Sequence, residues 1–251
     1  MSVPLLETRA LCRTFGAIAA ARDIDFRLEA GARHALIGPN GAGKTTFVNL
    51  LAGAIAASSG AVLLKGRDVT RVAQAERVKL GLSRTFQINR LFRGLSVLEN
   101  VYIPVAERVG AAPSMFRPAG RRRDVIDEAM QLLRTLRLAD DAARRVAELP
   151  YGRQRLVELA IALGRKPEVL LLDEPAAGVP SAESHIILDA IGDLPPHIAV
   201  LIIDHDMDLV FRFADRITVL VGGAVFATGS PREIGSNPDV RAVYLGQAAH
   251  G

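Results

Sequence analysis

The stretch GPNGAGKTT at residues 38–46 constrains the fold of this chain more than any other feature. It lies between a short apolar run at 35–37 and a segment in which apolar residues recur at helical spacing from Phe47 to Ala54. A glycine-rich turn between a strand and a helix lets backbone N–H groups close around phosphate oxygens, and the helix adds its positive end. The sequence therefore predicts a strand–loop–helix unit that grips phosphate.

The spacing of this loop is G-x-x-x-x-G-K-[ST], which places Lys44 to reach β- and γ-phosphates and the Thr45 hydroxyl to ligate Mg²⁺. The alternative is a chance glycine turn ahead of a helix. Because a strand and a helix both flank the loop, phosphate binding is favoured. The residues predicted to bind nucleotide here are Gly38, Pro39, Asn40, Gly41, Ala42, Gly43, Lys44, Thr45 and Thr46.

A second motif, VLLLDEP at 169–175, is a continuous apolar run that closes on two acids. This pattern is typical of a strand buried on both faces of a parallel sheet. Phosphate cleavage needs a carboxylate that holds Mg²⁺, directly or through water, and a second group that orients the attacking water. Asp173 suits the first role and Glu174 the second. Capping of a helix is the alternative, and it fits less well with acids that end a buried run.

The rest of the chain extends this pattern to an α/β fold. HIAVLIIDHD at 197–206 repeats the buried-strand design, so strands alternating with helices predict a mostly parallel sheet. A hairpin is expected to turn at Gly222 and Gly223, as an antiparallel addition. Helical periodicity dominates residues 89–166, which indicates an inserted α-helical lobe. We expect one domain, 1–251, in which the arginine-rich stretch 110–123 is a solvated loop.

Composition excludes few classes of protein. The chain carries 31 Lys and Arg against 27 Asp and Glu, and this excess is too small to indicate a nucleic-acid partner, so none is expected. No window approaches the roughly 20 apolar residues of a membrane span. The single cysteine, Cys12, excludes an internal disulfide and indicates a reducing compartment. We expect a soluble chain that can dock on a membrane protein.

With these motifs in place, the sequence resembles the nucleotide-binding subunit of ABC transporters from Leu6 to Gln247. IGPNGAGKTT resembles the Walker A motif of that family and LLLDEP its Walker B motif. RTFQ places Gln87 at the Q-loop, which senses the γ-phosphate and Mg²⁺ and faces the membrane subunit. LIIDHD places His205 at the switch-histidine position, expected to contact γ-phosphate. Phe15 matches the aromatic residue that stacks on adenine.

The resemblance implies a P-loop NTPase core with ATP and Mg²⁺ as cofactors. Taken singly, Gln87 could be a surface amide, Phe15 a core residue and His205 a locally bonded strand-end histidine. Their order and spacing around two phosphate motifs favour the functional roles. The implied catalytic residues are Glu174, His205 and Gln87, and the implied metal ligands are Thr45, Gln87 and Asp173.

Within the family, RTFQINRLFRGLSVLENV, DEPAAG and the tail NPDVRAVYLGQA most resemble the branched-chain amino-acid uptake branch. In that branch the tail, here 236–251, forms a short C-terminal helix. The resemblance implies an ATP-hydrolysing importer subunit for branched-chain or other amino acids, or a related small polar solute. Its partners would be membrane permease subunits, a second ATPase subunit and, indirectly, a periplasmic solute-binding protein. It would be peripheral, at the cytoplasmic face of the inner membrane.

Other interpretations stay open. A lipid- or lipopolysaccharide-export ATPase, a non-hydrolysing regulatory subunit, and an ABC ATPase of DNA repair or translation share the core motifs. Near Gln87, four apolar residues could receive a coupling helix of the permease or belong to the core of the lobe; these are Leu91, Phe92, Leu95 and Val97.

Two departures from the family pattern bear on the mechanism. The stretch LPYGRQ at 149–154 replaces the usual LSGGQ signature, which acts on the ATP of the partner subunit. Pro150 has neither hydroxyl nor N–H to offer the γ-phosphate. Pro180 replaces a D-loop Asp or Asn, although proline suits a helix start. Because the signature acts in trans, Pro150 favours a heterodimer with one strong and one weakened site over a homodimer; full competence of both sites is the alternative. The residues expected to act in trans are Pro150, Tyr151, Gly152, Arg153 and Gln154.

Overall fold

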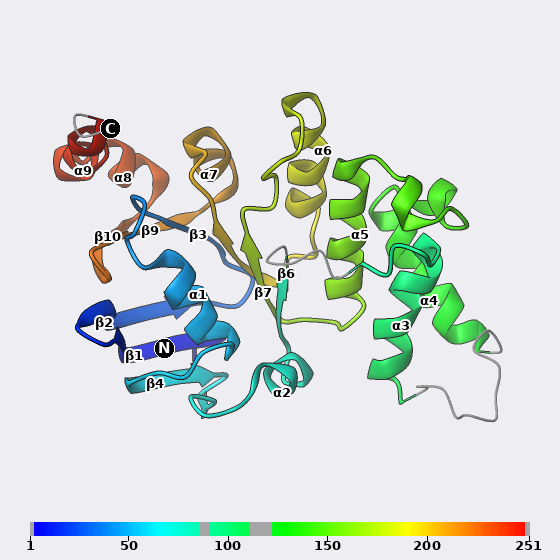
Figure 1. The fold of residues 1–251 in the computed structure, drawn as a ribbon, viewed down its shortest axis with the longest axis horizontal. Coiled ribbons are helices and arrows are strands. Elements are labelled where there is room, and N and C mark those ends of the chain that lie inside the picture. Colours follow the sequence, from blue (N-terminus) through cyan, green and yellow to red (C-terminus); the bar gives the residue numbers. More distant parts are fainter. Residues whose placement is uncertain (1–2, 86–90, 111–121, 249–251) are drawn as a thin grey trace. The chain divides into compact units, whose positions relative to one another are not determined.

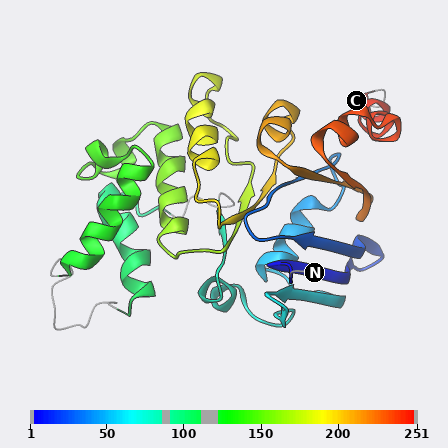
Figure 2. The same ribbon diagram turned by 180° about the vertical axis from the view of Figure 1, so that it is seen from behind.

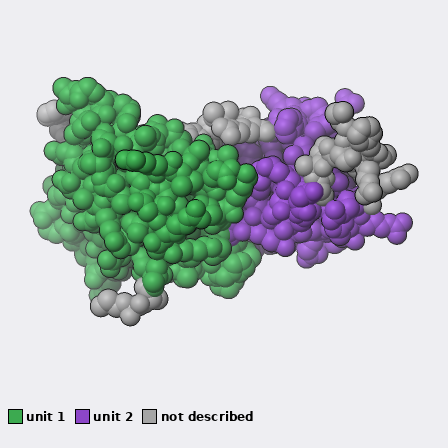
Figure 3. Space-filling view, turned by 90° about the horizontal axis from the view of Figure 1, so that it is seen from below, with its two compact units in different colours: residues 1–83, 168–174, 195–251 green, residues 84–167, 175–194 purple. Residues whose placement is uncertain are grey.

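The structure is a computed structural model that describes residues 3–85, 91–110 and 122–248 (Figure 1). It divides into two compact units (Figure 3). Unit 1 consists of residues 1–83, 168–174 and 195–251, and unit 2 of residues 84–167 and 175–194. We describe each unit separately.

The phosphate-binding motifs belong to a six-stranded sheet with the order β10-β9-β3-β8-β7-β6. Strands β9, β3, β8 and β7 are parallel, and β10 is antiparallel to β9. This arrangement confirms the predicted mostly parallel sheet with an antiparallel hairpin. The strands are β3 (Arg33–Ile37), β6 (Leu82–Thr85), β7 (Val169–Asp173), β8 (Ala199–Ile203), β9 (Arg216–Val221) and β10 (Ala224–Gly229).

The carboxyl ends of the parallel strands meet at one edge of this sheet. Ile203 at the end of β8 is in register with Leu36 of β3 on one side and with Asp173 of β7 on the other. The loop after β3, the acids that end β7 and the DHD segment after β8 therefore emerge at the same edge. In open α/β sheets this edge is where ligands bind.

A second sheet, of antiparallel strands, completes the β structure of unit 1 (Figure 2). Its order is β2-β1-β4-β5, from β1 (Leu6–Phe15), β2 (Ile18–Leu28), β4 (Ser59–Leu64) and β5 (Arg67–Asp68). None of these strands was predicted from the sequence. The pairing of β1 with β2 and β4 contains register shifts, and Ala10 and Asp23 have φ values of 42° and 45°. Such bulges break the alternation of apolar and polar residues by which a strand is recognised.

The core of unit 1 forms around α1 (Lys44–Ala52), the helix that follows the phosphate loop. Phe47, Val48 and Leu51 of α1 are fully buried in one cluster with residues of both sheets. Burial of this face fixes the direction in which α1 leaves the loop. The remaining helices in the described part of unit 1 are α2 (Gln74–Lys79), α7 (Met207–Phe213), α8 (Pro231–Ser236) and α9 (Pro238–Ala248).

Apart from Arg84 and Thr85, which end β6, the regular structure in the described part of unit 2 is helical. It contains α3 (Val97–Arg108), α4 (Arg123–Thr135), α5 (Tyr151–Leu163), α6 (Ser181–Gly192) and the short 3₁₀ turns η1 (Ala139–Asp141) and η2 (Val146–Glu148). Ser96 and Glu99 form a capping box that starts α3. Arg108 of α3 donates two hydrogen bonds of 2.6 Å to the Glu128 carboxylate of α4. These polar contacts supplement the apolar packing between the helices.

Four apolar residues near Gln87 were expected to form either a docking patch or part of the core. The structure buries some of them and exposes others. Val97 is fully buried and Leu91 is 9 % exposed, so both belong to the packed interior. Leu95 is half-buried, and Phe92 is 57 % exposed. Within the described ranges, no helix is long and apolar enough to cross a membrane.

Candidate nucleotide-binding site

The loop between β3 and α1 is closed by the lysine that follows it. Lys44 Nζ donates hydrogen bonds to the carbonyl oxygens of Gly38 at 2.5 Å and of Pro39 at 3.0 Å. Gly43 is the N-cap of α1 with φ 95°, and among the described residues no side chain caps this helix, whose first turn carries no acid. The positive end of α1 is therefore not neutralised by its own residues. It suits an anion bound at the loop.

Two glycines allow the loop to lie this close to its neighbours. A Cβ on Gly38 would clash with the carbonyl oxygen of Leu220, and a Cβ on Gly43 would clash with that of Ala20. Both neighbours are backbone atoms, one in β9 and the other in β2, which cannot turn aside as a side chain can. The tight conformation of a phosphate-wrapping loop is thus specified by the sequence, and the residues present fit a triphosphate.

The Lys44 ammonium is half-buried and lies in the field of the acids that end β7. Burial lowers the pKa of Lys44, and the negative charges of Glu174 and Asp173 act in the opposite direction. The Lys44 ammonium therefore lies within electrostatic range of both carboxylates. This places Lys44 on the phosphate side and the acids where metal and water would be handled.

Glu174 is held in an unusual backbone conformation. Its φ is 45°, a value that costs a non-glycine residue roughly 1–2 kcal/mol. Its N–H donates to the carbonyl oxygen of Ile203 at 2.8 Å, which ties the residue to β8. Backbone strain that the surroundings maintain is typical of functional sites. The result is that Glu174 Oε1 lies 3.4 Å from Nδ1 of His205.

His205 stands on a loop that a buried acid organises. The Asp204 carboxylate is 5 % exposed and accepts hydrogen bonds from the N–H groups of His205 at 2.8 Å and Asp206 at 3.0 Å. Burial raises the pKa of Asp204, although these two bonds oppose the rise. The His205 side chain itself is 74 % exposed. Sequence reasoning missed Asp204, for which the available signal was an acid directly after a strand of five buried apolar residues.

Phe15 lies at the end of the β1–β2 hairpin, paired in register with Ile18. The two side chains are 46 % and 71 % exposed, so the hairpin end presents an apolar surface. Ala20, two residues further along β2, contacts Gly43 of the phosphate loop, which brings this surface near the loop. The Arg13 guanidinium lies 4.5 Å from the centre of the Phe15 ring. An exposed aromatic ring beside a phosphate loop fits stacking on a nucleobase.

The predicted metal ligands are placed only in part. Thr45 is exposed in the first turn of α1, and Asp173 is half-buried at the end of β7. Gln87 lies outside the described residues. In the part of the chain that the structure describes, no three His, Cys, Asp or Glu side chains could hold an ion together. Mg²⁺ does not need such a cluster, because it commonly keeps waters and takes one or two protein oxygens plus substrate phosphates. The hydroxyl and carboxylate present fit that mode.

The residues expected to act in trans lie in unit 2, at the start of α5. Pro150 is the N-cap of α5, and no side chain of the described ranges caps this helix end. Arg153 forms an ion pair with the buried Asp141, and Gln154 Nε2 donates to the Leu149 carbonyl oxygen at 2.9 Å. Arg153 and Gln154 are thus engaged within unit 2, where they hold the start of α5.

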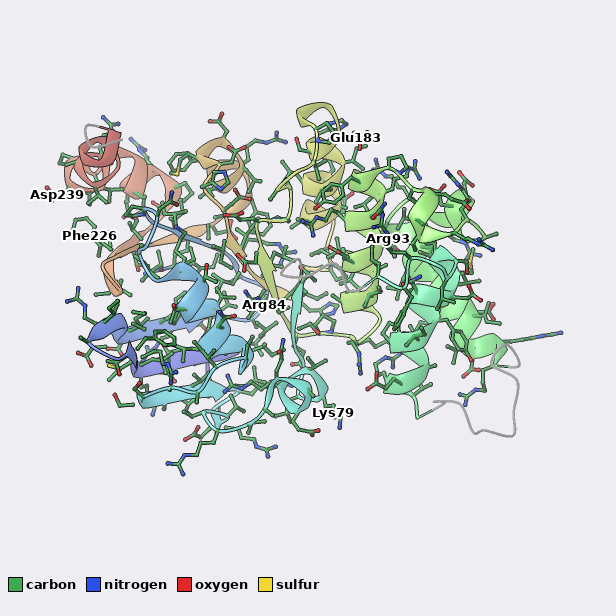
Figure 4. The ribbon with its side chains drawn as sticks, viewed as in Figure 1. Lys79, Arg84, Arg93, Glu183, Phe226 and Asp239 are labelled. Carbon is green, nitrogen blue, oxygen red and sulfur yellow. The ribbon has the colours of Figure 1, made fainter. Side chains whose placement is uncertain are left out.

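The N-terminal end of α5 also contacts α6. Glu183 Oε2 would lie 2.8 Å from a Cβ on Gly152, and the Tyr151 ring would lie 3.4 Å from a Cβ on Gly178 (Figure 4 labels Glu183). A Cβ on Gly152 would therefore require the end of the Glu183 side chain to move, whereas Gly178 is favoured by its φ of 74°. The lining of the small cavity beside them consists of Pro150, Gly152, Arg153, Leu156, Glu183 and Ile186.

Three features define a P-loop nucleoside triphosphatase: a glycine-rich loop after the parallel strand β3, a half-buried lysine, and two acids where β7 ends, with β8 lying between these two strands. The family model for ABC transporters matches residues 21–177, and a model named branched-chain amino acid ATP-binding cassette transporter matches residues 224–250. The chain belongs to the ABC transporter family and is an ATP-binding, ATP-hydrolysing cassette.

Individual relatives agree with this assignment over the full length. The chain is 38 % identical to the high-affinity branched-chain amino acid transport ATP-binding protein LivG of Salmonella typhimurium, with 99 % of this chain and 100 % of that protein covered. It is 36 % identical to BraF of Pseudomonas aeruginosa, with the same coverage. Among solved structures, the ADP conformation of an ATP-binding cassette of an ABC transporter is 29 % identical, with a TM-score of 0.86 and 98 % and 100 % coverage.

Proposed function

We propose that this chain is the ATPase subunit of an importer for branched-chain amino acids or similar small polar solutes. The arrangement of Lys44, Glu174 and His205 at one edge of the sheet carries the proposal. The names of the LivG and BraF relatives, and the match of the branched-chain cassette model to residues 224–250, support the choice of substrate.

In this mechanism the loop amides and Lys44 bind the phosphates, and Phe15 stacks on the base. Thr45, Asp173 and Gln87 would hold Mg²⁺, which when bound neutralises charge on the phosphate oxygens. Glu174 orients the attacking water. His205, whose Nδ1 lies 3.4 Å from Glu174 Oε1, would contact the γ-phosphate.

The role of Glu174 is tested by Glu174→Gln, which keeps the shape of the side chain and removes its charge. We expect ATP binding to persist, phosphate release to fall to background, and a closed dimer to accumulate with MgATP on size-exclusion chromatography. The matched control is Glu168→Gln in the same unit, an acid that pairs with Lys65 at the surface. Hydrolysis that survives in Glu174→Gln would refute the assigned role.

We further propose that the chain works as a peripheral subunit on permease subunits at the cytoplasmic face of the membrane. The exposed ring of Phe92, which follows the Gln87 segment, supports docking in that region. A periplasmic solute-binding protein would act on the same complex indirectly. Co-purification with the permease pair encoded by neighbouring genes tests this partnership, and Phe92→Asp is expected to weaken it. Recovery of the complex unchanged by Phe92→Asp would argue against this surface.

The second ATPase subunit is proposed to be a different chain. The structure of α5 supports this, because Pro150 supplies no hydroxyl or N–H at the helix start, while the positive helix end remains. The site that depends on this signature would be the weaker one. The test pairs this chain with its genomic partner and replaces each catalytic glutamate separately. Equal loss of hydrolysis from either replacement would contradict the asymmetry.

The domain organisation is part of the same proposal. We propose that residues 1–251 form one nucleotide-binding domain, in which residues 89–166 are the lobe that carries the signature and residues 236–251 are a tail helix of the uptake branch. The extent of unit 2, with 84–167 as its longer segment, supports the first boundary. Helix α9 supports the second.

A further inference from the structure

The turn between β9 and β10 is bonded directly to the phosphate loop. The N–H of Gly223 donates to the carbonyl oxygen of Ala42 at 3.0 Å, and Ala42 lies inside the loop. The carbonyl oxygen of Gly223 accepts a hydrogen bond from the N–H of Arg22 on β2 at 2.7 Å. Gly223 therefore bridges the loop and the second sheet through both of its backbone groups.

There is little room at this bridge for anything but a glycine. Gly223 has φ 83°, and a Cβ on it would lie 3.0 Å from the carbonyl oxygen of Ala20 and 3.1 Å from that of Ala19. A Cβ added to Gly43 would in turn lie 3.3 Å from the Cα of Gly223. The loop and the turn are thus packed backbone to backbone. A movement of the turn by a few tenths of an ångström is passed directly to the loop.

The bond to Ala42 also sets the direction of the next amide. In a trans peptide the C=O and N–H groups point in opposite directions. Because the Ala42 carbonyl points at Gly223, the N–H of Gly43 points away from the turn. Gly43 is the N-cap of α1, and amides at this place are donors to bound phosphate.

We propose that Gly223 is a positioning residue of the nucleotide site, which orients the Ala42–Gly43 peptide through its N–H and through the absence of a side chain. The proposal rests on the proposed function in one respect, that the loop binds ATP. Gly223 does not touch the nucleotide and acts through the loop. A misdirected Gly43 N–H removes one charge-assisted hydrogen bond, which corresponds to a loss of affinity of about tenfold or more.

The adjacent glycine provides a matched control. Gly222 also has a positive φ, 53°, but within the described part of the chain a Cβ on it would meet only the end of the Arg22 side chain at 3.1 Å, which can turn aside. Gly222→Ala and Gly223→Ala add the same methyl group in the same turn. Both are expected to lower the melting temperature of the nucleotide-free chain, because both place alanine at a positive φ.

Only Gly223→Ala is expected to raise the Kd for MgADP and the KM for MgATP by about tenfold or more, with kcat at saturation changed little. If the wild-type chain binds no adenine nucleotide, the proposed function fails. If it does bind and the two alanine variants have equal Kd values, the inference about Gly223 fails.

A second measurement uses the unaltered chain, so it does not depend on a variant that folds. By linkage, nucleotide that stabilises the loop must also stabilise the loop's bond to Gly223. Hydrogen exchange followed by NMR is expected to slow at the Gly223 N–H by about tenfold on saturation with MgADP, and to change less at Gly222. Equal exchange rates at Gly223 with and without MgADP would overturn the proposal.

Discussion

Replacement of Arg77 tests how the far end of the phosphate-loop helix is held. The Arg77 side chain on α2 is 1 % exposed. Its guanidinium donates to the carbonyl oxygens of Leu50 at 2.8 Å and Leu51 at 2.7 Å, which belong to the last turn of α1. It also donates to those of Val72 at 2.9 Å and Thr70 at 3.0 Å. Burial lowers the pKa of Arg77 to about 10, so the group stays charged at pH 7.

The structure sets the scale of the loss in Arg77→Met. Methionine retains much of the apolar stem but removes the guanidinium from four carbonyl oxygens. That of Leu50 keeps a hydrogen bond from the N–H of Gly53 at 3.2 Å, and each of the other acceptors left buried without a donor costs about 1–3 kcal/mol. Part of this cost is offset, because the folded chain no longer buries a charge. We expect a net loss of about 3–5 kcal/mol in the free energy of unfolding. For a chain of this length that corresponds to a fall of about 6–10 °C in melting temperature.

The assay is urea unfolding followed by far-UV circular dichroism at pH 7. Lys79→Met on the same helix is the matched control, because Lys79 is 61 % exposed and pairs with Glu76 at the surface (Figure 4). We expect this control to change the free energy of unfolding by less than about 0.5 kcal/mol. If Arg77→Met and Lys79→Met agreed within about 1 kcal/mol, the capping of α1 by Arg77 would be refuted.

The pH dependence of stability is expected to involve His34, because burial, with a smaller effect of Arg216, lowers its pKa to about 4. The pKa of His34 in the folded state lies below the ordinary 6.5. The stabilisation that comes from burying neutral His34 is therefore fully present above pH 6.5 and is lost as the pH falls towards 4. Linkage gives a loss of about 2 kcal/mol between pH 7 and pH 5, which His34→Gln should abolish in urea titrations at both pH values. Phe15→Ala should weaken binding of ATP by about 1–2 kcal/mol and of inorganic triphosphate hardly at all, as measured by calorimetry, because only the base is stacked. Equal losses for the two ligands would exclude stacking. Pro150→Ser should raise phosphate release by the assembled pair by about tenfold, through a hydroxyl restored at the signature; an unchanged rate would show that LPYGRQ is already competent.

The parts of the fold and the site that depend on short continuous segments could be predicted from the sequence. Three segments each combine an apolar strand pattern with polar residues directly after it. They are the loop at 38–46 with the apolar run before it, the buried run that ends in Asp173 and Glu174, and the buried run that precedes His205. Parallel strands bring such endings to one edge, so the placement of Lys44 near the acids could be predicted from three local patterns. The register of β3, β8 and β7 confirms the shared edge.

Other features depend on contacts between segments that are distant in sequence. The β1–β2 pair was missed because bulges near Ala10 and Asp23 interrupt its alternation. Arg77 appears in the sequence as one more basic residue of a polar helix, and only the fold places it against the end of α1. Gly223 was recognised as a turn glycine, whereas its hydrogen bond to Ala42 joins segments far apart along the chain.

The central claim is that main-chain amides around Lys44 bind the triphosphate of ATP. The most direct measurement is calorimetric titration of the purified chain and of Lys44→Ala with MgATP, with the exposed Lys65→Ala as the matched control. We predict that the wild-type chain and Lys65→Ala bind MgATP with the same affinity. We predict that Lys44→Ala binds it about a hundredfold more weakly, a loss of about 2.7 kcal/mol. Undiminished affinity in Lys44→Ala, or no affinity in the wild-type chain, would contradict the account.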